Sequence, residues 1–336
     1  MKQASLVFYI GMAVSMAFLG WAVAKLDFSQ AFNAIMRLNP IWLFPYLLIQ
    51  LAAIWVRAMR LRLITEPVKR VPMRTLISSV CIGFMGNMIF PMKIGELIRV
   101  YVVAKMERVS RSGILATIVV ERIFDVFATA ALVVLAVFYA TPLTVDPAVW
   151  RNVVSVAEVF VAASLVAGVL VFLVASREGF APRWLNGFIR LFPSATSMTI
   201  EGIFTSFRRG LQLMRNGRHF GMAMLQTAVL FAMCIAGSLV ALLLFGIPAA
   251  FELALVLCVF TLVGAAVPSA PGALGTYHAG VVFALTLYGV EPNKALGVAI
   301  FLHLFMFTLY LVSGGWYVWH NKMTFAELRH SADARS

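Results

Sequence analysis

The chain alternates between long apolar runs and short polar gaps along its whole length. Apolar segments lie at residues 4–24, 41–56, 75–92, 113–140, 153–175, 219–245, 253–267, 273–288 and 295–319. An α-helix needs about 20 apolar residues to cross the hydrocarbon core of a bilayer. The pattern therefore predicts an all-α, polytopic membrane protein.

Composition supports this fold class. Of the 336 residues, 62% are hydrophobic and 12% are charged, and the mean hydropathy is +0.93. Soluble domains carry roughly 25% charged residues. We expect one integral membrane domain over residues 1–336, without a sizeable soluble domain.

The net charge of +13 is unevenly distributed. Lys and Arg crowd the gaps at 57–74, 93–111 and 177–218 and the tail after 320, whereas the other gaps contain only Lys25, Arg37, Arg151 and Lys294. The positive-inside rule places the crowded gaps and both termini in the cytoplasm. The charge thus indicates topology and contact with anionic lipid headgroups. It does not favour nucleic acid as a partner.

The gaps on both sides of segment 75–92 are strongly basic, so both are expected on the same side. A helix that crosses the membrane once, however, ends on the opposite side. We therefore predict a re-entrant hairpin over 75–106 that breaks at Pro91 and returns through a helix near 96–106. Irregular backbone at membrane depth is tolerated where protein or water covers it.

The second half contains a similar broken segment at 253–288. Its Gly264, Pro271 and Gly275 correspond in kind to Gly86, Pro91 and Gly95. Two broken segments that enter from opposite faces are typical of an inverted repeat with a binding site near the midplane. The alternative is that 253–267 and 273–288 are ordinary spanning helices.

These patterns predict six full spans and two re-entrant hairpins. The halves cover residues 1–175 and 219–319, with a cytoplasmic linker at 176–218 and a tail at 320–336. Helical spacing of apolar residues within 200–214 predicts an amphipathic helix in the linker, which joins the halves. Segment 4–24 could pass for a signal peptide, but we expect a retained first helix.

A first charged cluster follows the break at Pro91. It contains Lys93, Glu96 and Arg99. Gly95 is expected to give the turn its conformational freedom. Glu96 falls in the first turn of the returning helix, where a carboxylate is favoured, and Arg99 can pair with it. Lys93 and Arg99 are candidates to bind an anionic headgroup, and the alternative is a surface hairpin with ordinary interfacial charges.

A second cluster, Glu121, Arg122 and Asp125, lies within the apolar run 113–140. The three side chains fall on one arc of a helix. Because exposing that arc to lipid is costly, we expect it to face inward and pair internally or with the first cluster. If the span instead begins at Ile123, residues 121–122 lie at the interface.

A third candidate group, Thr276, Tyr277 and His278, follows Pro271 and Gly272. The histidine could donate to phosphate or carry a proton, or simply pack against its neighbours. Arg57 and Arg60 are interpreted as topology signals rather than headgroup contacts. His303 alone has little predictive value.

The sequence contains no HExxH motif, no P-loop and no GxSxG motif. Cys81, Cys234 and Cys258 lack paired spacing and are expected to be buried core residues. We expect neither a metal site nor a cofactor. Without an evident nucleophile, catalysis is not expected.

Three motifs together resemble the flippase-like family, the membrane region of bacterial lysylphosphatidylglycerol synthases. They are NxxxPxxxGExxR (Asn87, Pro91, Gly95, Glu96, Arg99), ERxxD (Glu121, Arg122, Asp125) and PGxxG (Pro271, Gly272, Gly275). The resemblance covers residues from about 6 to 320. It implies a stand-alone member that moves a lipid between leaflets and lacks the aminoacyl-transfer domain. Many relatives have a glutamate where this chain has His278, which argues against an identical cargo.

The resulting hypothesis is a flippase or scramblase that binds an anionic lipid, glycolipid or hopanoid-type cargo. Its substrate-binding candidates are Asn87, Lys93, Glu96, Arg99, Glu121, Arg122, Asp125, Tyr277 and His278. Its structural hinges are Pro91, Gly95, Pro271, Gly272 and Gly275. The alternatives are a transporter of a small anionic solute and a scaffold for a lipid-synthesis enzyme.

Overall fold

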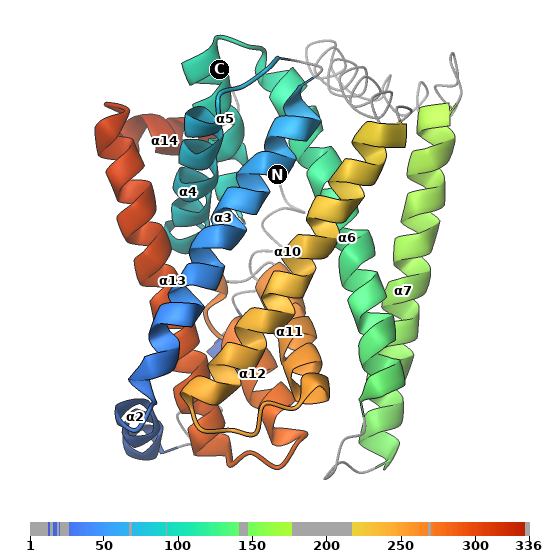
Figure 1. Cartoon of the computed structure of the whole chain (residues 1–336), viewed down its shortest axis with the longest axis vertical. Helices are drawn as coiled ribbons and strands as arrows, with labels where there is room; N and C mark the ends of the chain where they lie inside the picture. Colours follow the sequence, from blue (N-terminus) through green and yellow to red (C-terminus); the bar gives the residue numbers. More distant parts are fainter. Residues whose placement is uncertain are drawn as a thin grey trace.

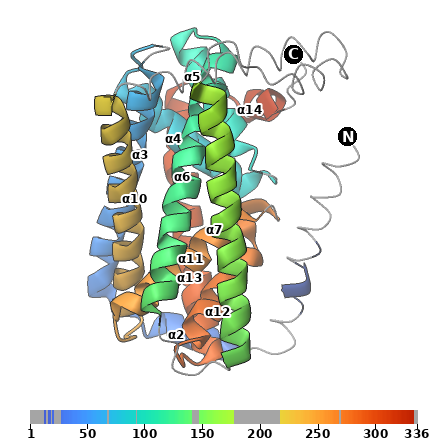
Figure 2. The same cartoon turned by 90° about the vertical axis from the view of Figure 1, so that its right-hand side faces the viewer.

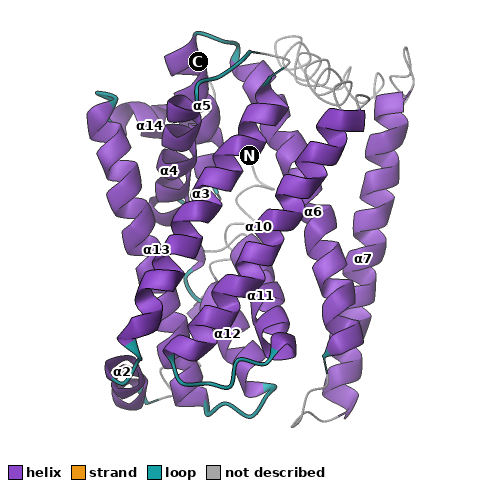
Figure 3. Ribbon diagram, viewed as in Figure 1, coloured by secondary structure: helices purple, strands orange, loops and turns teal. Residues whose placement is uncertain are grey.

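The computed structural model describes residues 27–66, 69–91, 93–140, 147–176, 217–267 and 270–332, together with residues 13, 16–18 and 20. Within these ranges the chain consists of helices and loops and contains no strand (Figure 3). The predicted all-α membrane fold is confirmed. Most of segment 4–24 and the predicted amphipathic helix of the linker lie outside the described residues.

The helices follow one another in a simple order (Figure 1). They are α2 (Phe28–Met36), α3 (Leu43–Thr65), α4 (Met73–Ile89), α5 (Gly95–Glu107), α6 (Arg111–Tyr139), α7 (Pro147–Ser176), α10 (Gly217–Leu244), α11 (Phe251–Ala266), α12 (Thr276–Thr286), α13 (Pro292–His320) and α14 (Phe325–Ala332), with 3-10 turns η1 (Pro40–Trp42) and η2 (Pro271–Ala273).

Within the described ranges, three stretches are long and apolar enough to cross a membrane, at Pro40–Thr65, Gly217–Leu244 and Pro292–His320. The helix α6 is equally long, with 29 residues, but contains the charged residues of the second cluster. In the view turned by 90°, α7 lies along α6 (Figure 2). The count of six full spans stays a prediction.

Capping side chains define several helix starts. Asp27 accepts hydrogen bonds from the backbone of Ser29 and Gln30 at the start of α2. Ser110 does the same for α6, and Glu291 caps α13 ahead of Pro292. Such side chains satisfy backbone N–H groups that have no partner within the helix.

The helix α3 is longer than the predicted segment 41–56. It continues for nine further residues to Thr65, because Leu61 and Ile64 extend its buried face by two turns. Arg57 and Arg60 therefore lie within the helix rather than at its end. This shift brings both arginines toward the interior of the molecule.

Two pairs of short helices occupy opposite halves of the bundle. The pair α4 and α5 lies toward one end of the molecule, and the pair α11 and α12 toward the other (Figure 1). With 17 and 16 residues, α4 and α11 extend about 25 Å at 1.5 Å per residue, less than a hydrocarbon core of about 30 Å. The helices of each pair pack closely against one another.

The breaks of the two pairs meet inside the bundle. The last turn of α4 contacts η2, and a Cβ added at Gly272 would lie 3.5 Å from the sulfur of Met88. Residues of both breaks thus contribute to one interior region. Entry into a bilayer from opposite faces, and the inverted repeat, stay predictions.

Candidate functional site

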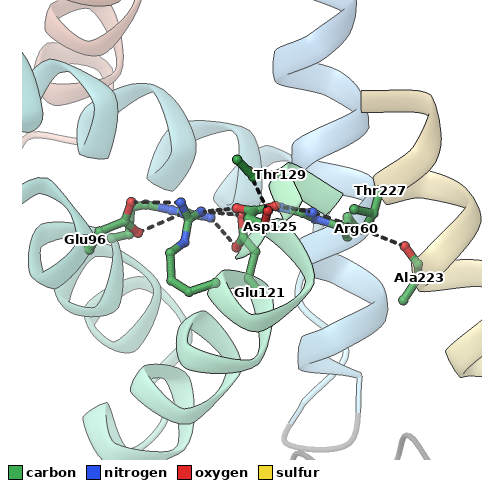
Figure 4. A network of polar contacts seen from close by, with 9 residues as sticks. Arg60, Glu96, Glu121, Asp125, Thr129, Ala223 and Thr227 are labelled. Carbon is green, nitrogen blue, oxygen red and sulfur yellow. Dashed lines mark hydrogen bonds and ion pairs between the residues drawn. The ribbon is translucent and has the colours of Figure 1, made fainter. Parts of the chain in front are cut away.

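A network of three arginines and three carboxylates crosses the interior (Figure 4). The arginines come from three helices, Arg60 from α3, Arg99 from α5 and Arg122 from α6. The carboxylates are Glu96 on α5 and Glu121 and Asp125 on α6. The first and second predicted clusters therefore join into one network, as expected for an inward-facing arc.

Glu121 lies at the centre of this network. Its two oxygens accept from all three arginines, with N–O distances of 3.0 Å to Arg60, 2.9 Å to Arg99 and 3.0 Å to Arg122. The side chain of Glu121 is 1% exposed. A buried carboxylate of this kind is stable only when it is paired and hydrogen-bonded.

The remaining carboxylates close the network at its two ends. Glu96 binds Arg99 at 3.0 Å, which confirms the predicted pairing along α5, and lies 3.8 Å from Arg122. Asp125 binds Arg60 at 2.6 Å and Arg122 at 3.1 Å. Arg60 also donates to Thr227 at 3.1 Å, which connects the network to α10.

The interpretation of Arg60 as a topology signal is wrong. Arg60 is completely buried and binds two carboxylates of α6. Its charge is needed inside the bundle because Arg99 and Arg122 alone would leave the three carboxylates unbalanced. The sequence signal was an arginine that closely follows one apolar run, together with acidic residues inside another.

A cavity of about 310 Å³ lies beside this network. Its walls combine side chains of α3, α4, α10, α11 and α13 with residues of both breaks. The charged residues that line it are Arg57, Lys93, Glu96 and Arg122. Three cations and one carboxylate give these walls a net positive charge.

Polar and apolar side chains divide the rest of the cavity wall. Asn87 and Tyr277, both predicted, line it together with Gln50, Tyr46 and Tyr310. Apolar lining residues include Ile54, Phe84, Met88, Leu257 and Met306. The mixed lining can accommodate a charged group next to hydrocarbon.

Arg99, Glu121 and Asp125 do not line the cavity. They form the buried part of the network behind it. Arg99 is paired with both neighbouring carboxylates, and its contact with a headgroup stays a prediction. Arg122, with 41% of its side chain exposed, connects the network to the cavity.

Two histidines meet at the second break. Nδ1 of His303 on α13 lies 3.3 Å from Nε2 of His278 on α12. His303 lines the cavity and lies next to Gly272, whereas His278 lies behind it. The third predicted group thus includes His303, which the sequence alone did not indicate.

The predicted hinge glycines have two different roles. Gly272 and Gly275 have φ angles of 65° and 92°, which favour glycine. The φ angle of Gly95 is not in this positive range. The prediction that the turn needs the conformational freedom of Gly95 is therefore wrong. Instead, a Cβ on Gly95 would collide with the backbone oxygen of Gly83 and with Asn87. Its role is close packing of α5 on α4.

The two proline hinges lie where the helices are interrupted. Pro91 follows the last turn of α4, and Pro271 opens the 3-10 turn before α12. Proline cannot donate a backbone hydrogen bond, so helices end at such positions. Both predicted break positions are confirmed as interruptions of helical structure.

The cysteines are free, and two of them are neighbours despite lacking paired spacing. Cys234 on α10 and Cys258 on α11 are close enough to interact, and both line the cavity. Among the described residues no group of three or more His, Cys, Asp or Glu side chains could bind a metal ion.

Comparison with known proteins identifies the family. The model of the family described as lysylphosphatidylglycerol synthase TM region matches residues 8–314. The chain belongs to this family. The match confirms the resemblance carried by the three motifs and covers both hairpins and the cavity.

A glycosyltransferase from Haloferax volcanii, AglD, is 26% identical to the chain over 262 residues. The match covers 71% of the chain and 42% of AglD, so the chain spans about two-fifths of that protein's length. No solved structure matches the chain. The family match and the match to AglD indicate a multi-pass membrane protein with a function related to membrane lipids.

Proposed function

We propose that this chain moves a lipid with an anionic headgroup between the leaflets of the bacterial inner membrane. The observation that carries the proposal is the interior cavity, whose charged lining consists of three cations and one carboxylate. Unpaired charge inside a membrane protein is costly and marks sites of substrate or ion passage. A negatively charged group is the complement of this lining.

The position of the cavity supports movement rather than simple storage. Residues of both breaks line it, including Phe90 and Lys93 from the first and Gly272 and Ala273 from the second. Binding sites of many transporters lie between broken helices of two halves. A headgroup held there would be midway between the leaflets while its acyl chains stay in the surrounding lipid.

The family description names a lipid synthase, and the relative is named as a glycosyltransferase. For this chain we propose transport of an intact lipid without chemical change. The cavity is lined by cations and tyrosines suited to hold an anion, and the buried carboxylates are already occupied by arginines.

The test is lipid exchange in sealed vesicles. The purified protein is reconstituted with phosphatidylglycerol that bears a fluorophore on one acyl chain, and dithionite is added outside. Without exchange, only the outer leaflet is bleached. We expect bleaching to extend to inner-leaflet lipid, and the recovered lipid to be chemically unaltered.

Arg122→Gln removes a cavity cation and should slow exchange at least tenfold, since charged hydrogen bonds contribute about 1.5–3 kcal/mol each. Arg62→Gln is the matched control, because Arg62 is exposed on the same helix as Arg57 and does not line the cavity. Equal bleaching with and without protein, for every anionic lipid tried, would refute the proposal.

A small anionic solute is a second candidate, favoured by the cavity volume of about 310 Å³, which lies at the lower end of small-molecule sites. The same vesicles distinguish the two. Uptake of glycerol 3-phosphate into the lumen without lipid exchange would favour the solute.

A further inference from the structure

We infer that the transported headgroup carries two negative charges, as a phosphate monoester does, and that Arg57 and Lys93 select it. The inference rests on the proposed function and specifies its substrate class. It also adds Arg57, which was interpreted as a topology signal, to the substrate-binding residues.

The charge balance of the interior is the first argument. The three arginines and three carboxylates of the buried network neutralise one another. Arg57 and Lys93 remain as further cations on the cavity wall. Among the described residues, neither has a carboxylate within 4.0 Å. The cavity therefore has two positive charges that no described side chain offsets.

Arg57 is held in place without a carboxylate. Its guanidinium lies 5.3 Å from the centre of the Phe84 ring, and Phe84 stacks on Tyr310 at 4.6 Å. Such a cation–π contact orients the guanidinium but leaves its N–H donors available. All three of these residues line the cavity.

Lys93 approaches from the first break. Its φ angle of 54° places it in the left-handed region, which non-glycine residues rarely adopt. Its side chain is near enough to Arg122 and Glu96 for electrostatic interaction. A strained backbone that places a lysine beside an arginine indicates a position selected for ligand contact rather than for stability.

A phosphate monoester matches this arrangement better than a diester. A monoester carries about −1.5 to −2 charges at pH 7, with three acceptor oxygens, because its second pKa is near 6. A phosphodiester headgroup such as that of phosphatidylglycerol carries one negative charge. Arginine can bind phosphate oxygens with two parallel hydrogen bonds, and lysine acts as a compact second charge.

The test compares two lipids that differ by one methyl group and one charge. Phosphatidic acid and phosphatidylmethanol, with identical acyl chains, are titrated onto the purified protein in mild detergent, and bound lipid is counted by native mass spectrometry. We expect phosphatidic acid to bind about tenfold more tightly, which corresponds to ~1.4 kcal/mol. Glycerol 3-phosphate, a water-soluble phosphate monoester, is tested as a competitor of phosphatidic acid.

Arg57→Gln and Lys93→Gln should each reduce the preference to less than about threefold, since either change removes one of the two charges. Arg62→Gln should retain it. Thermal unfolding of each variant shows whether the fold is intact, and Arg57→Lys should restore part of the preference if charge is what matters.

Equal affinity for the two lipids in the folded wild-type protein would overturn the inference even if lipid exchange is observed. A preference that survives in both Gln variants would also overturn it. If glycerol 3-phosphate competes as strongly as phosphatidic acid, the dianion selectivity holds and the lipid part of the proposed function fails.

Discussion

Glu121 is the residue on which the buried network depends. It is the one carboxylate that contacts all three arginines, and it has almost no contact with solvent. Removing one partner of a buried ion pair leaves an uncompensated charge, which costs far more than the pair contributes. The network should therefore be sensitive to loss of this single charge.

Glu121→Gln is expected to lower the free energy of unfolding by about 3–5 kcal/mol, the range for breaking a buried ion pair. The amide is nearly the same size but cannot neutralise Arg60 and Arg99. Thermal unfolding of the purified protein in detergent, followed by intrinsic tryptophan fluorescence, measures the change.

The matched control is Glu66→Gln. Glu66 pairs with Arg70 at 2.8 Å at the end of α3, where the arginine side chain is 82% exposed. Surface pairs of this kind contribute about 0–1 kcal/mol. Equal destabilisation by the two substitutions would show that the buried network has no special weight in stability.

The sequence revealed only part of this site. The acidic members were found because carboxylates in an apolar run are costly, and their pairing followed from helical spacing. Arg60 was missed because an arginine after an apolar run looks like the end of a span. His303 was missed because its partner, His278, is 25 positions away and only tertiary packing brings the two together.

At the scale of elements, glycines let the short helices approach one another. Gly83 and Gly86 of α4 face α5 at Gly95, and Gly264 of α11 lies against the backbone of Thr276 at the start of α12. In each pair a Cβ would take space that the partner backbone occupies. The pairs are therefore stabilised by close backbone contact rather than by large side chains.

Gly95→Ala should destabilise the α4–α5 pair by about 1–3 kcal/mol, the usual cost of overpacking. The added methyl would meet Gly83 and Asn87, and Asn87 lines the cavity, so lipid binding should weaken as well. Thermal unfolding and native mass spectrometry provide the two measurements.

Gly221→Ala is the control at this scale. It lies within α10, and a Cβ there has open space, with no atom within 4 Å. Alanine is a better helix former than glycine by about 1 kcal/mol, so stability should stay the same or rise. An unchanged unfolding temperature in Gly95→Ala would contradict the packing role.

Helix positions were predictable because apolar runs and prolines mark them directly. The predicted return helix near 96–106 is observed at 95–107, and the second break has the expected proline and glycines. The end of α3 was predicted nine residues too early. The arginines after residue 56 interrupt the apolar pattern, although the helix continues and is buried by its neighbours. The role of Gly95 depends on what packs against it, which spacing alone does not reveal.

At the scale of the whole molecule, the pair α4 and α5 lies toward one end of the bundle and the pair α11 and α12 toward the other (Figure 1). We predict that the loops flanking α4–α5 lie on the cytoplasmic side and those flanking α11–α12 on the other. Single cysteines at Arg70 and Ser110 should react with a membrane-impermeant thiol reagent from one side of sealed vesicles. Cysteines at Ala250, just before α11, and at Lys294, in the first turn of α13, should react from the other side.

Each single cysteine is introduced into a variant of the protein in which the three native cysteines have been replaced. Right-side-out and inside-out vesicles should give complementary labelling. Reaction of all four positions from the same side would exclude entry of the two hairpins from opposite faces, and a split within either pair would exclude a hairpin at that location.

The balanced network also bears on what could drive transport. Every carboxylate in it already holds an arginine, so a proton taken up by Glu121 would leave a guanidinium without its counter-charge in the interior. A driving force that acts through Glu121 would therefore disrupt the ion pairs that hold α3, α5 and α6 together. Glu96 borders the cavity, so an incoming anion would compete with the Glu96 carboxylate for Arg122.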